Sequence, residues 1–178
     1  DWASSGYYHT DAVGISFPTE NIGYMLSPLG YVYKTTNGGV DWASSGYYHT
    51  DAVGISFPTE NIGYMLSPLG YVYKTTNGGV DWTSIGFYHT DAVGISFPTE
   101  NIGYLLSPLG YVYKTTNGGV DWASIGYYHT DAVGISFPSE NIGYMLSPLG
   151  YVYKTTNGGV DWVSSGYYHT DAVGISFP

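Results

Sequence analysis

The stretch that decides the fold is residues 1–40, DWASSGYYHTDAVGISFPTENIGYMLSPLGYVYKTTNGGV. It recurs unchanged at 41–80 and with a few substitutions in two further copies, and a partial fifth copy begins at Asp161. A period near 40 residues is typical both of four-stranded propeller blades and of helical HEAT or armadillo pairs. The local pattern inside the unit has to separate the two.

That pattern indicates strands. Glycine and proline interrupt the unit too densely for a helix of about ten residues. Ser27-Pro28-Leu29-Gly30 suits a type I turn, and Asn37-Gly38-Gly39 tolerates positive φ. Between these breaks, four runs rich in β-forming residues predict strands. The predicted strands of the first unit are 12–17, 22–27, 31–35 and 42–48.

The expected fold is therefore all-β: a propeller of four-stranded antiparallel blades, one per 40 residues. A single small sheet cannot bury both faces, so copies have to stack around an axis. The small residues Gly14 and Ser16 place the first strand of each blade innermost, and Trp42 suits the wider outer part between blades. Phe17, Tyr24, Tyr31 and Tyr33 are expected in the core. The parsing gives one repeat domain, 1–178: a fourth strand at 1–10, blades at 11–50, 51–90, 91–130 and 131–170, and a lone innermost strand at 171–178.

Thr35 to Trp42 resembles an Asp-box, the S/T-x-D/N-x-G-x-x-W motif of BNR repeats in sialidase-like propellers. The wider blade pattern is similar to photosystem II stability/assembly factor-like propellers. Asn37 replaces the more usual Asp, and Asp41 stands where Thr is common. The resemblance implies a folding element away from the binding face with no activity of its own. The sequence leaves the compartment open, and the resemblance favours an extracellular or cell-surface location. The motif positions are Thr35, Asn37, Gly39, Trp42, Thr75, Asn77, Gly79, Trp82, Thr115, Asn117, Gly119, Trp122, Thr155, Asn157, Gly159 and Trp162.

Composition excludes several classes of function. The chain has 14 carboxylates and 4 basic residues, all lysine, for a formal net charge of −10. Phosphate recognition needs a field of Lys and Arg, so nucleic acid and anionic membranes are not expected as partners. No apolar run approaches the roughly 20 residues of a membrane span, and no N-terminal signal pattern is present. Without cysteine there are no disulfides, thiol nucleophiles or Cys-ligated metals.

Catalysis is not expected. Sialidases of the fold that this chain resembles hold the substrate carboxylate with arginines, and this chain has none. Asp11 and Glu20 recur in every unit and formally allow a two-carboxylate glycosidase. Catalytic carboxylates need different environments, however, whereas near-identical blades give each copy the same surroundings. We therefore predict that the protein is not an enzyme and uses no cofactor.

The candidate ligand-binding residues lie in the connection from one blade to the next, Tyr7 to Asp11 and its copies. An aromatic ring beside histidine and aspartate suits sugar binding by stacking and hydrogen bonds. His9 and Asp11 supply too few ligands per blade for a metal, so no metal site is predicted. The alternative is that Asp11 caps the loop and His9 is a turn residue. The candidates are Tyr8, His9, Asp11, Tyr48, His49, Asp51, Tyr88, His89, Asp91, Tyr128, His129 and Asp131.

The predicted function is a structural or interaction scaffold that presents identical loops around an axis. The alternative is a multivalent, lectin-like binder of glycans or other small polar ligands in the grooves between blades. The final blade, at 171–178, has only its innermost strand, and unpaired strand edges recruit partners. The expected partners are therefore other copies of the chain or further repeats of a longer one, with glycans as the alternative ligand.

Overall fold

The fold is all-β, as predicted. The computed structural model describes residues 12–48, 52–88, 91–128, 132–168 and 174–177, and every regular element there is a strand. Four antiparallel sheets form, each of four strands in chain order, and we call them blades 1 to 4. Blade 1 holds β1 (Gly14–Ser16), β2 (Gly23–Leu26), β3 (Tyr31–Thr35) and β4 (Ala43–Tyr47). Blade 2 holds β5 (Gly54–Ser56), β6 (Gly63–Leu66), β7 (Tyr71–Thr75) and β8 (Thr83–Phe87).

The other two blades repeat this pattern. Blade 3 holds β9 (Gly94–Ser96), β10 (Gly103–Leu106), β11 (Tyr111–Thr115) and β12 (Ala123–Tyr127). Blade 4 holds β13 (Gly134–Ser136), β14 (Gly143–Leu146), β15 (Tyr151–Thr155) and β16 (Val163–Tyr167). Each strand lies within its predicted range. The third strand of a blade matches the prediction, the second and fourth are two residues shorter, and the first is half as long.

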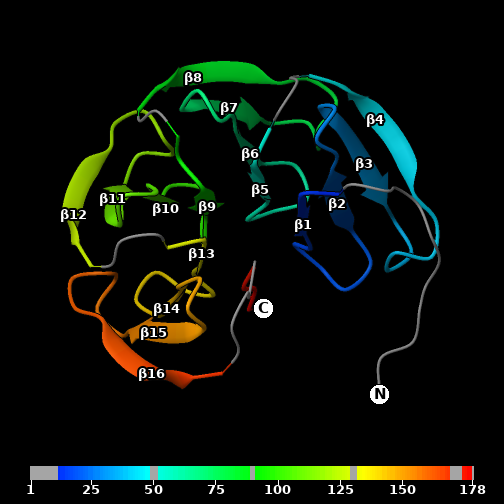
Figure 1. Cartoon of the computed structure of the whole chain (residues 1–178). Helices are drawn as coiled ribbons and strands as arrows, with labels where there is room; N and C mark the ends of the chain where they lie inside the picture. Colours follow the sequence, from blue (N-terminus) through cyan, green and yellow to red (C-terminus); the bar gives the residue numbers. More distant parts are fainter. Residues whose placement is uncertain (1–11, 49–51, 89–90, 129–131, 169–173, 178) are drawn as a thin grey trace.

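The blades are arranged as a propeller (Figure 1). The first strands β1, β5, β9 and β13 lie innermost and contact one another in succession, and β4, β8, β12 and β16 lie outermost. A cavity of about 530 Å³ runs along the axis, lined by the Ile-Ser-Phe-Pro stretches of the four blades and by 175–177. The predicted order of strands from the axis outward is confirmed.

The turns form where glycine permits them. Gly30 has φ 83° and donates its backbone N–H to the Ser27 carbonyl at 3.0 Å, which closes the β2–β3 turn. Gly38 and Gly39, with φ 68° and 88°, carry the β3–β4 turn. These are the turn positions that the sequence predicts, because a residue with a Cβ is strained at positive φ.

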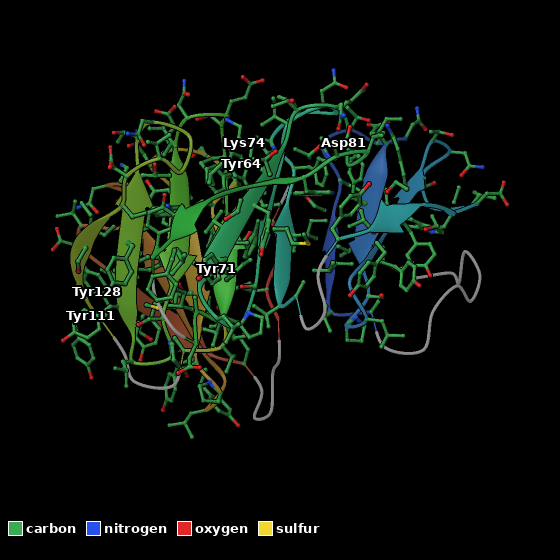
Figure 2. All side chains as sticks on the ribbon, turned by 90° about the horizontal axis from the view of Figure 1, so that it is seen from above. Tyr64, Tyr71, Lys74, Asp81, Tyr111 and Tyr128 are labelled. Atoms are coloured by element: carbon green, nitrogen blue, oxygen red, sulfur yellow. The ribbon has the colours of Figure 1, made fainter. Side chains whose placement is uncertain are left out.

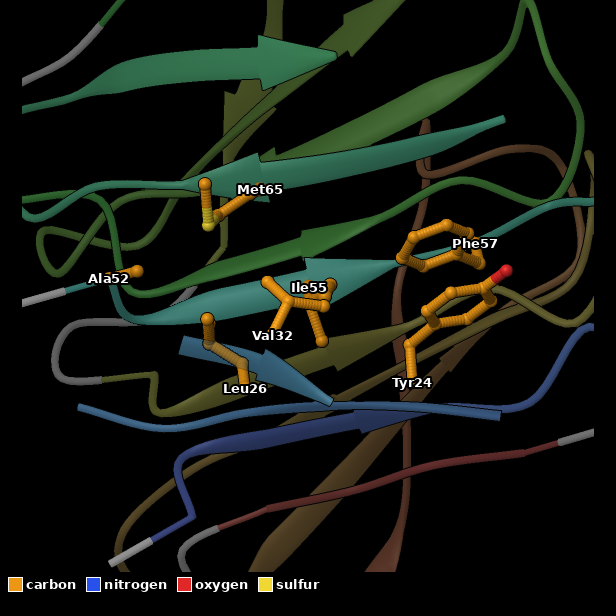
Figure 3. Close-up of a cluster of buried hydrophobic side chains, with 7 residues drawn as sticks. All are labelled: Tyr24, Leu26, Val32, Ala52, Ile55, Phe57 and Met65. Carbon is orange, nitrogen blue, oxygen red and sulfur yellow. The ribbon is translucent and has the colours of Figure 1, made fainter. Parts of the chain in front are cut away.

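The core lies between the blades rather than within one sheet. We call the face that a blade turns to the preceding blade its front face, and the opposite one its back face. The back face of blade 1 and the front face of blade 2 bury one hydrophobic cluster, shown in Figure 3. Its members are Tyr24, Leu26 and Val32 from blade 1 and Ala52, Ile55, Phe57 and Met65 from blade 2. Equivalent clusters join blades 2 and 3 and blades 3 and 4.

The expectation for Tyr31 was wrong. Its side chain is 40% exposed and lies against Tyr47 with ring centroids 5.3 Å apart. Val32, the next residue on β3, points to the opposite side and is fully buried. The alternation of the strand turns the valine to the cluster with the following blade and the tyrosine to the other face, where its place at the start of β3 leaves it exposed.

Candidate functional site

The turn between β3 and β4 is held by side chains of its own. Thr35 Oγ accepts the backbone N–H of Gly39 at 2.9 Å and donates to Asn37 Oδ1 at 3.0 Å. Asn37 Oδ1 also accepts the Asp41 N–H at 2.9 Å, and its amide donates to the Asp41 carboxylate at 2.8 Å. The indole N–H of Trp42 donates to the Gly39 carbonyl at 3.1 Å. The same bonds among Thr, Asn, Gly and Asp recur in all four blades.

This arrangement uses the side chains for the turn itself. Asn37 supplies the carbonyl oxygen that an aspartate carboxylate would supply, and Asp41 accepts the spare amide hydrogens. The side chains satisfy backbone donors that the tight turn leaves without a strand partner. The resemblance to an Asp-box stays a prediction, and the geometry gives these residues a local role in folding.

Stacked aromatic rings join each blade to the next. The Tyr24 ring stacks on Phe57 with centroids 3.5 Å apart and planes inclined by 5°. Its hydroxyl donates to the Glu60 carbonyl at 2.7 Å, and the Lys34 ammonium lies 5.3 Å from the ring centroid. Tyr64 and Tyr104 repeat these contacts with blades 3 and 4.

The predicted ligand tyrosines also take part in these joints. The hydroxyl of Tyr48 lies within hydrogen-bond distance of the Val80 carbonyl of blade 2, and its ring lies 6.1 Å from that of Trp82. Tyr88 and Tyr128 make the equivalent bonds to Val120 and Val160 at 2.8 and 2.7 Å. The structure therefore brings each of these tyrosines against the following blade.

Burial changes the acidity of the joint tyrosines. It raises the pKa of Tyr48, Tyr88 and Tyr128, and the nearby carboxylates Asp81, Asp121 and Asp161 add to the shift. Burial, followed by the charge of Glu100, raises the pKa of Tyr64 to about 12. These hydroxyls stay protonated near neutral pH, so they act as hydrogen-bond donors and not as bases.

The other predicted ligand residues are mostly outside the described residues. Of the acidic candidates, only Asp91 is described. It has φ 62° and donates its backbone N–H to the Pro68 carbonyl at 3.0 Å. That bond places the connection after β8 at the same end of the propeller as the β6–β7 turn. Tyr8, His9, Asp11, His49, Asp51, His89, His129 and Asp131 lie outside the described residues, so a glycan site at these loops stays a prediction.

A repeated exposed aromatic pair beside the β2–β3 turn is the feature that sequence reasoning missed. Leu29 is 60% exposed in the β2–β3 turn, directly before the exposed Tyr31–Tyr47 pair. We call these three residues and their copies the Leu-Tyr-Tyr patches. The copies are Leu69, Tyr71 and Phe87; Leu109, Tyr111 and Tyr127; and Leu149, Tyr151 and Tyr167.

These patches lie away from the charged end of the molecule. Figure 2 shows Lys74 and Asp81 at one end of the propeller, whereas Tyr111 lies toward the other. The signal that could have found these patches is their place beside the Ser27–Gly30 turn, because residues in and next to a turn lie at the surface. Among the described residues, no three His, Asp or Glu side chains form a group that could hold a metal ion.

Comparison with known proteins identifies the fold of this chain and does not assign it to a family. No family model matches the sequence, and none of the curated proteins matches it. The structure is similar to YCF48 bound to a D1 peptide (TM-score 0.72, 16% identity over 94% of this chain and 57% of that one). It is also similar to YCF48 from Cyanidioschyzon merolae (TM-score 0.68, 17% identity, 93% of this chain and 59% of that one). The chain thus spans a little under three fifths of these proteins.

An enzyme shares the fold as well. The GH74 enzyme of Niastella koreensis is similar at a TM-score of 0.64 and 22% identity over 85% of this chain and 24% of that one. At these identities the likeness establishes a β-propeller and leaves function to the site. The described part of this chain contains no helix that is long and apolar enough to cross a membrane.

Proposed function

We propose that this protein is a non-catalytic interaction scaffold, and that it binds a protein or peptide partner through the Leu-Tyr-Tyr patches. The observation that carries the proposal is that four copies of an exposed leucine and aromatic pair recur around one end of the propeller. Tyrosine is enriched at binding hot spots because it offers a large ring and a polar tip at low entropic cost.

The charge of the chain indicates the kind of partner. A formal net charge of −10 favours the approach of a partner with a net positive charge, and the patches themselves bind its apolar side chains. Four equivalent patches give avidity to a partner that engages more than one of them. The similar YCF48 structure with a bound D1 peptide supports peptide binding by a propeller of this kind.

The proposal that the protein is not a catalyst rests on the equivalence of the carboxylates in the four blades. The carboxylates of Asp41 and its copies Asp81, Asp121 and Asp161 accept the same amide bond in every blade, so none of these four is set apart as an acid or a base. Acid and base roles need carboxylates whose pKa values differ.

The test uses a displayed library of random linear peptides selected on the intact chain. Affinities of the enriched peptides are then measured by calorimetry for wild type and for a variant with Tyr31→Ser, Tyr71→Ser, Tyr111→Ser and Tyr151→Ser. We expect this variant to lose about tenfold or more in affinity. The control carries Val40→Ser, Val80→Ser, Val120→Ser and Val160→Ser, which alter exposed side chains in the β3–β4 turn and its copies.

Two results would contradict the proposal. In one, the enriched peptides bind the tyrosine variant and wild type equally. In the other, no peptide is enriched and a glycan array shows sugar binding that survives the tyrosine changes, which would favour the lectin-like alternative.

A further inference from the structure

The described chain leaves one gap in the ring, between the C-terminal segment 174–177 and blade 1 (Figure 1). No Cα atom of β13 lies within 8 Å of one in β1, although β1, β5, β9 and β13 otherwise contact one another in succession. The surfaces on the two sides of this gap have known counterparts inside the ring, because the same sequence is repeated there.

On one side, the segment 174–177 occupies the place of an innermost strand. Phe177 donates its backbone N–H to Ser136 Oγ at 3.0 Å, as Phe137 does to Ser96 Oγ at 2.9 Å. Its ring stacks on Tyr144 with centroids 3.8 Å apart. The segment therefore has the contacts that β5, β9 and β13 make with the blade before them.

The segment 174–177 is not paired with a second strand of a sheet. The innermost strands β1, β5, β9 and β13 each pair with the second strand of their own blade, whereas 174–177 belongs to none of the four sheets. Phe177 is 39% exposed, compared with 4% for Phe137. Tyr144 and Val152 of blade 4 are only half-buried, although their counterparts Tyr24 and Val32 are fully buried.

On the other side, the front face of blade 1 is uncovered. Ile15 is 56% exposed and Ile55 is 7% exposed; Phe17 is 43% exposed and Phe57 is 4% exposed. Residues 12–40 and 52–80 are identical in sequence. The differences in exposure therefore measure what a preceding blade covers.

Inside the ring, the front face of each blade is buried mainly by one hairpin of the preceding blade. In the cluster between blades 1 and 2, Tyr24 and Leu26 lie on β2 and Val32 lies on β3. Tyr24 provides the stacked ring and the hydrogen bond across the joint. The β2–β3 hairpin is thus the element that covers the front face of the following blade, and β2 also pairs with the innermost strand.

We infer that the gap is a binding site for a β-hairpin with the sequence of residues 19–40. One such hairpin supplies the second strand that 174–177 lacks and the Tyr-Leu-Val surface that blade 1 lacks. Its tyrosine stacks on Phe17, and its leucine and valine cover Ile15. Addition of strands to an unpaired edge gains backbone hydrogen bonds together with side-chain burial.

The experiment adds a synthetic peptide, TENIGYMLSPLGYVYKTTNGGV, to the intact chain and measures binding by calorimetry and the melting temperature. We expect saturable one-to-one binding and a higher melting temperature, because a ligand of the folded state stabilises it. Ile15→Asn lowers the peptide affinity about tenfold or more, because it removes a buried apolar contact. Val80→Ser, on the exposed surface away from the gap, leaves the affinity unchanged, and a peptide with Y24S and L26N does not bind.

A fused chain covers the case in which the free peptide aggregates. Residues 19–40 are appended after Pro178, and we expect a monomer that melts at a higher temperature and protects Phe17 from hydroxyl-radical labelling. The inference is overturned if the fused hairpin changes neither the melting temperature nor the labelling. It is also overturned if sedimentation shows that the chain without peptide forms head-to-tail dimers that protect Phe17, because a second copy is then the occupant.

Discussion

Blades 1 and 3 both carry an isoleucine and a phenylalanine on the front faces of their innermost strands, and only blade 3 buries them. Ile95 and Phe97 lie under Tyr64, Leu66 and Val72 of blade 2, whereas Ile15 and Phe17 have no preceding blade among the described residues. The same two side chains thus belong to a core in one place and to an exposed surface in the other. The stability of the fold accordingly resides in the contacts between blades, as in other repeat proteins.

The largest expected effect comes from removing a ring at a closed joint. Phe97→Ala loses the stacked contact with Tyr64 and the edge contact with Trp122, and we expect it to lower the free energy of unfolding by about 3–5 kcal/mol. Phe17→Ala, at the uncovered face, should cost roughly half of that or less, because the ring is already partly exposed. Urea unfolding followed by tryptophan fluorescence gives both values. Equal losses would contradict the comparison.

High pH should loosen the closed joints. The folded-state pKa of Tyr64, about 12, lies above its ordinary value of 10, so the folded state holds this proton more tightly. The resulting stability is fully present below pH 10 and is lost as the pH rises toward 12, by about 2 kcal/mol.

Unfolding measured between pH 9 and pH 12 tests this. Tyr64→Phe should reduce the slope of stability against pH over about pH 10–12 and should also cost about 1 kcal/mol at neutral pH, because the bond to the Glu100 carbonyl is lost. Tyr71→Phe alters an exposed ring outside the joint and serves as the control. An unchanged slope in Tyr64→Phe would refute the assignment.

Glycines behind the joint phenylalanines offer a finer comparison. A Cβ on Gly103 would lie 2.4 Å from the Phe97 ring, and one on Gly23 would lie equally close to the Phe17 ring. Phe97 is held by its stack on Tyr64 and cannot move away, so Gly103→Ala should cost about 1–3 kcal/mol. Gly23→Ala should cost less, since Phe17 is free to move toward the uncovered side. Melting temperatures of the two variants decide this, and a reversed order would count against it.

The smallest effect concerns the serines that link neighbouring innermost strands. Ser56 Oγ accepts the Phe97 N–H at 2.9 Å, and Ser56→Ala should cost about 1 kcal/mol because that donor loses its partner. Ser176→Ala, at the exposed C-terminal segment, should change stability by a few tenths of a kcal/mol at most. Chemical denaturation resolves the difference, and equal effects would show that the link contributes nothing.

Local sequence determines the strands and turns of this protein well. The predicted strands, the turn at Ser27–Gly30 and the glycines at 38 and 39 all follow from residue preferences that act within a few positions. The sequence also predicted the order of strands from the axis outward, because small side chains are needed where the innermost strands crowd together. The 40-residue repeat predicted the remaining feature, which is the arrangement of equivalent blades around one axis.

The candidate site was harder to predict because it depends on contacts between copies. Nothing near Tyr48 in the sequence shows that its hydroxyl bonds to Val80 in the next blade. Tyr31 was expected in the core because it is large and aromatic, yet it is its strand neighbour Val32 that faces the cluster. A period of 40 residues shows which side chains recur, and it does not show which of them a neighbour covers.

The serine-to-phenylalanine link has a consequence for how such proteins lengthen. Every unit carries the acceptor on one side and the donor on the other, so a duplicated gene segment brings its own connector and fits at once beside its parent. Each added unit again leaves an unpaired serine acceptor or phenylalanine donor at the end of the array. Duplication alone therefore never produces a terminal unit that closes off the array. The array can stop lengthening only because it curves. Curvature brings the last unit against the first, and the closed ring then has no free end.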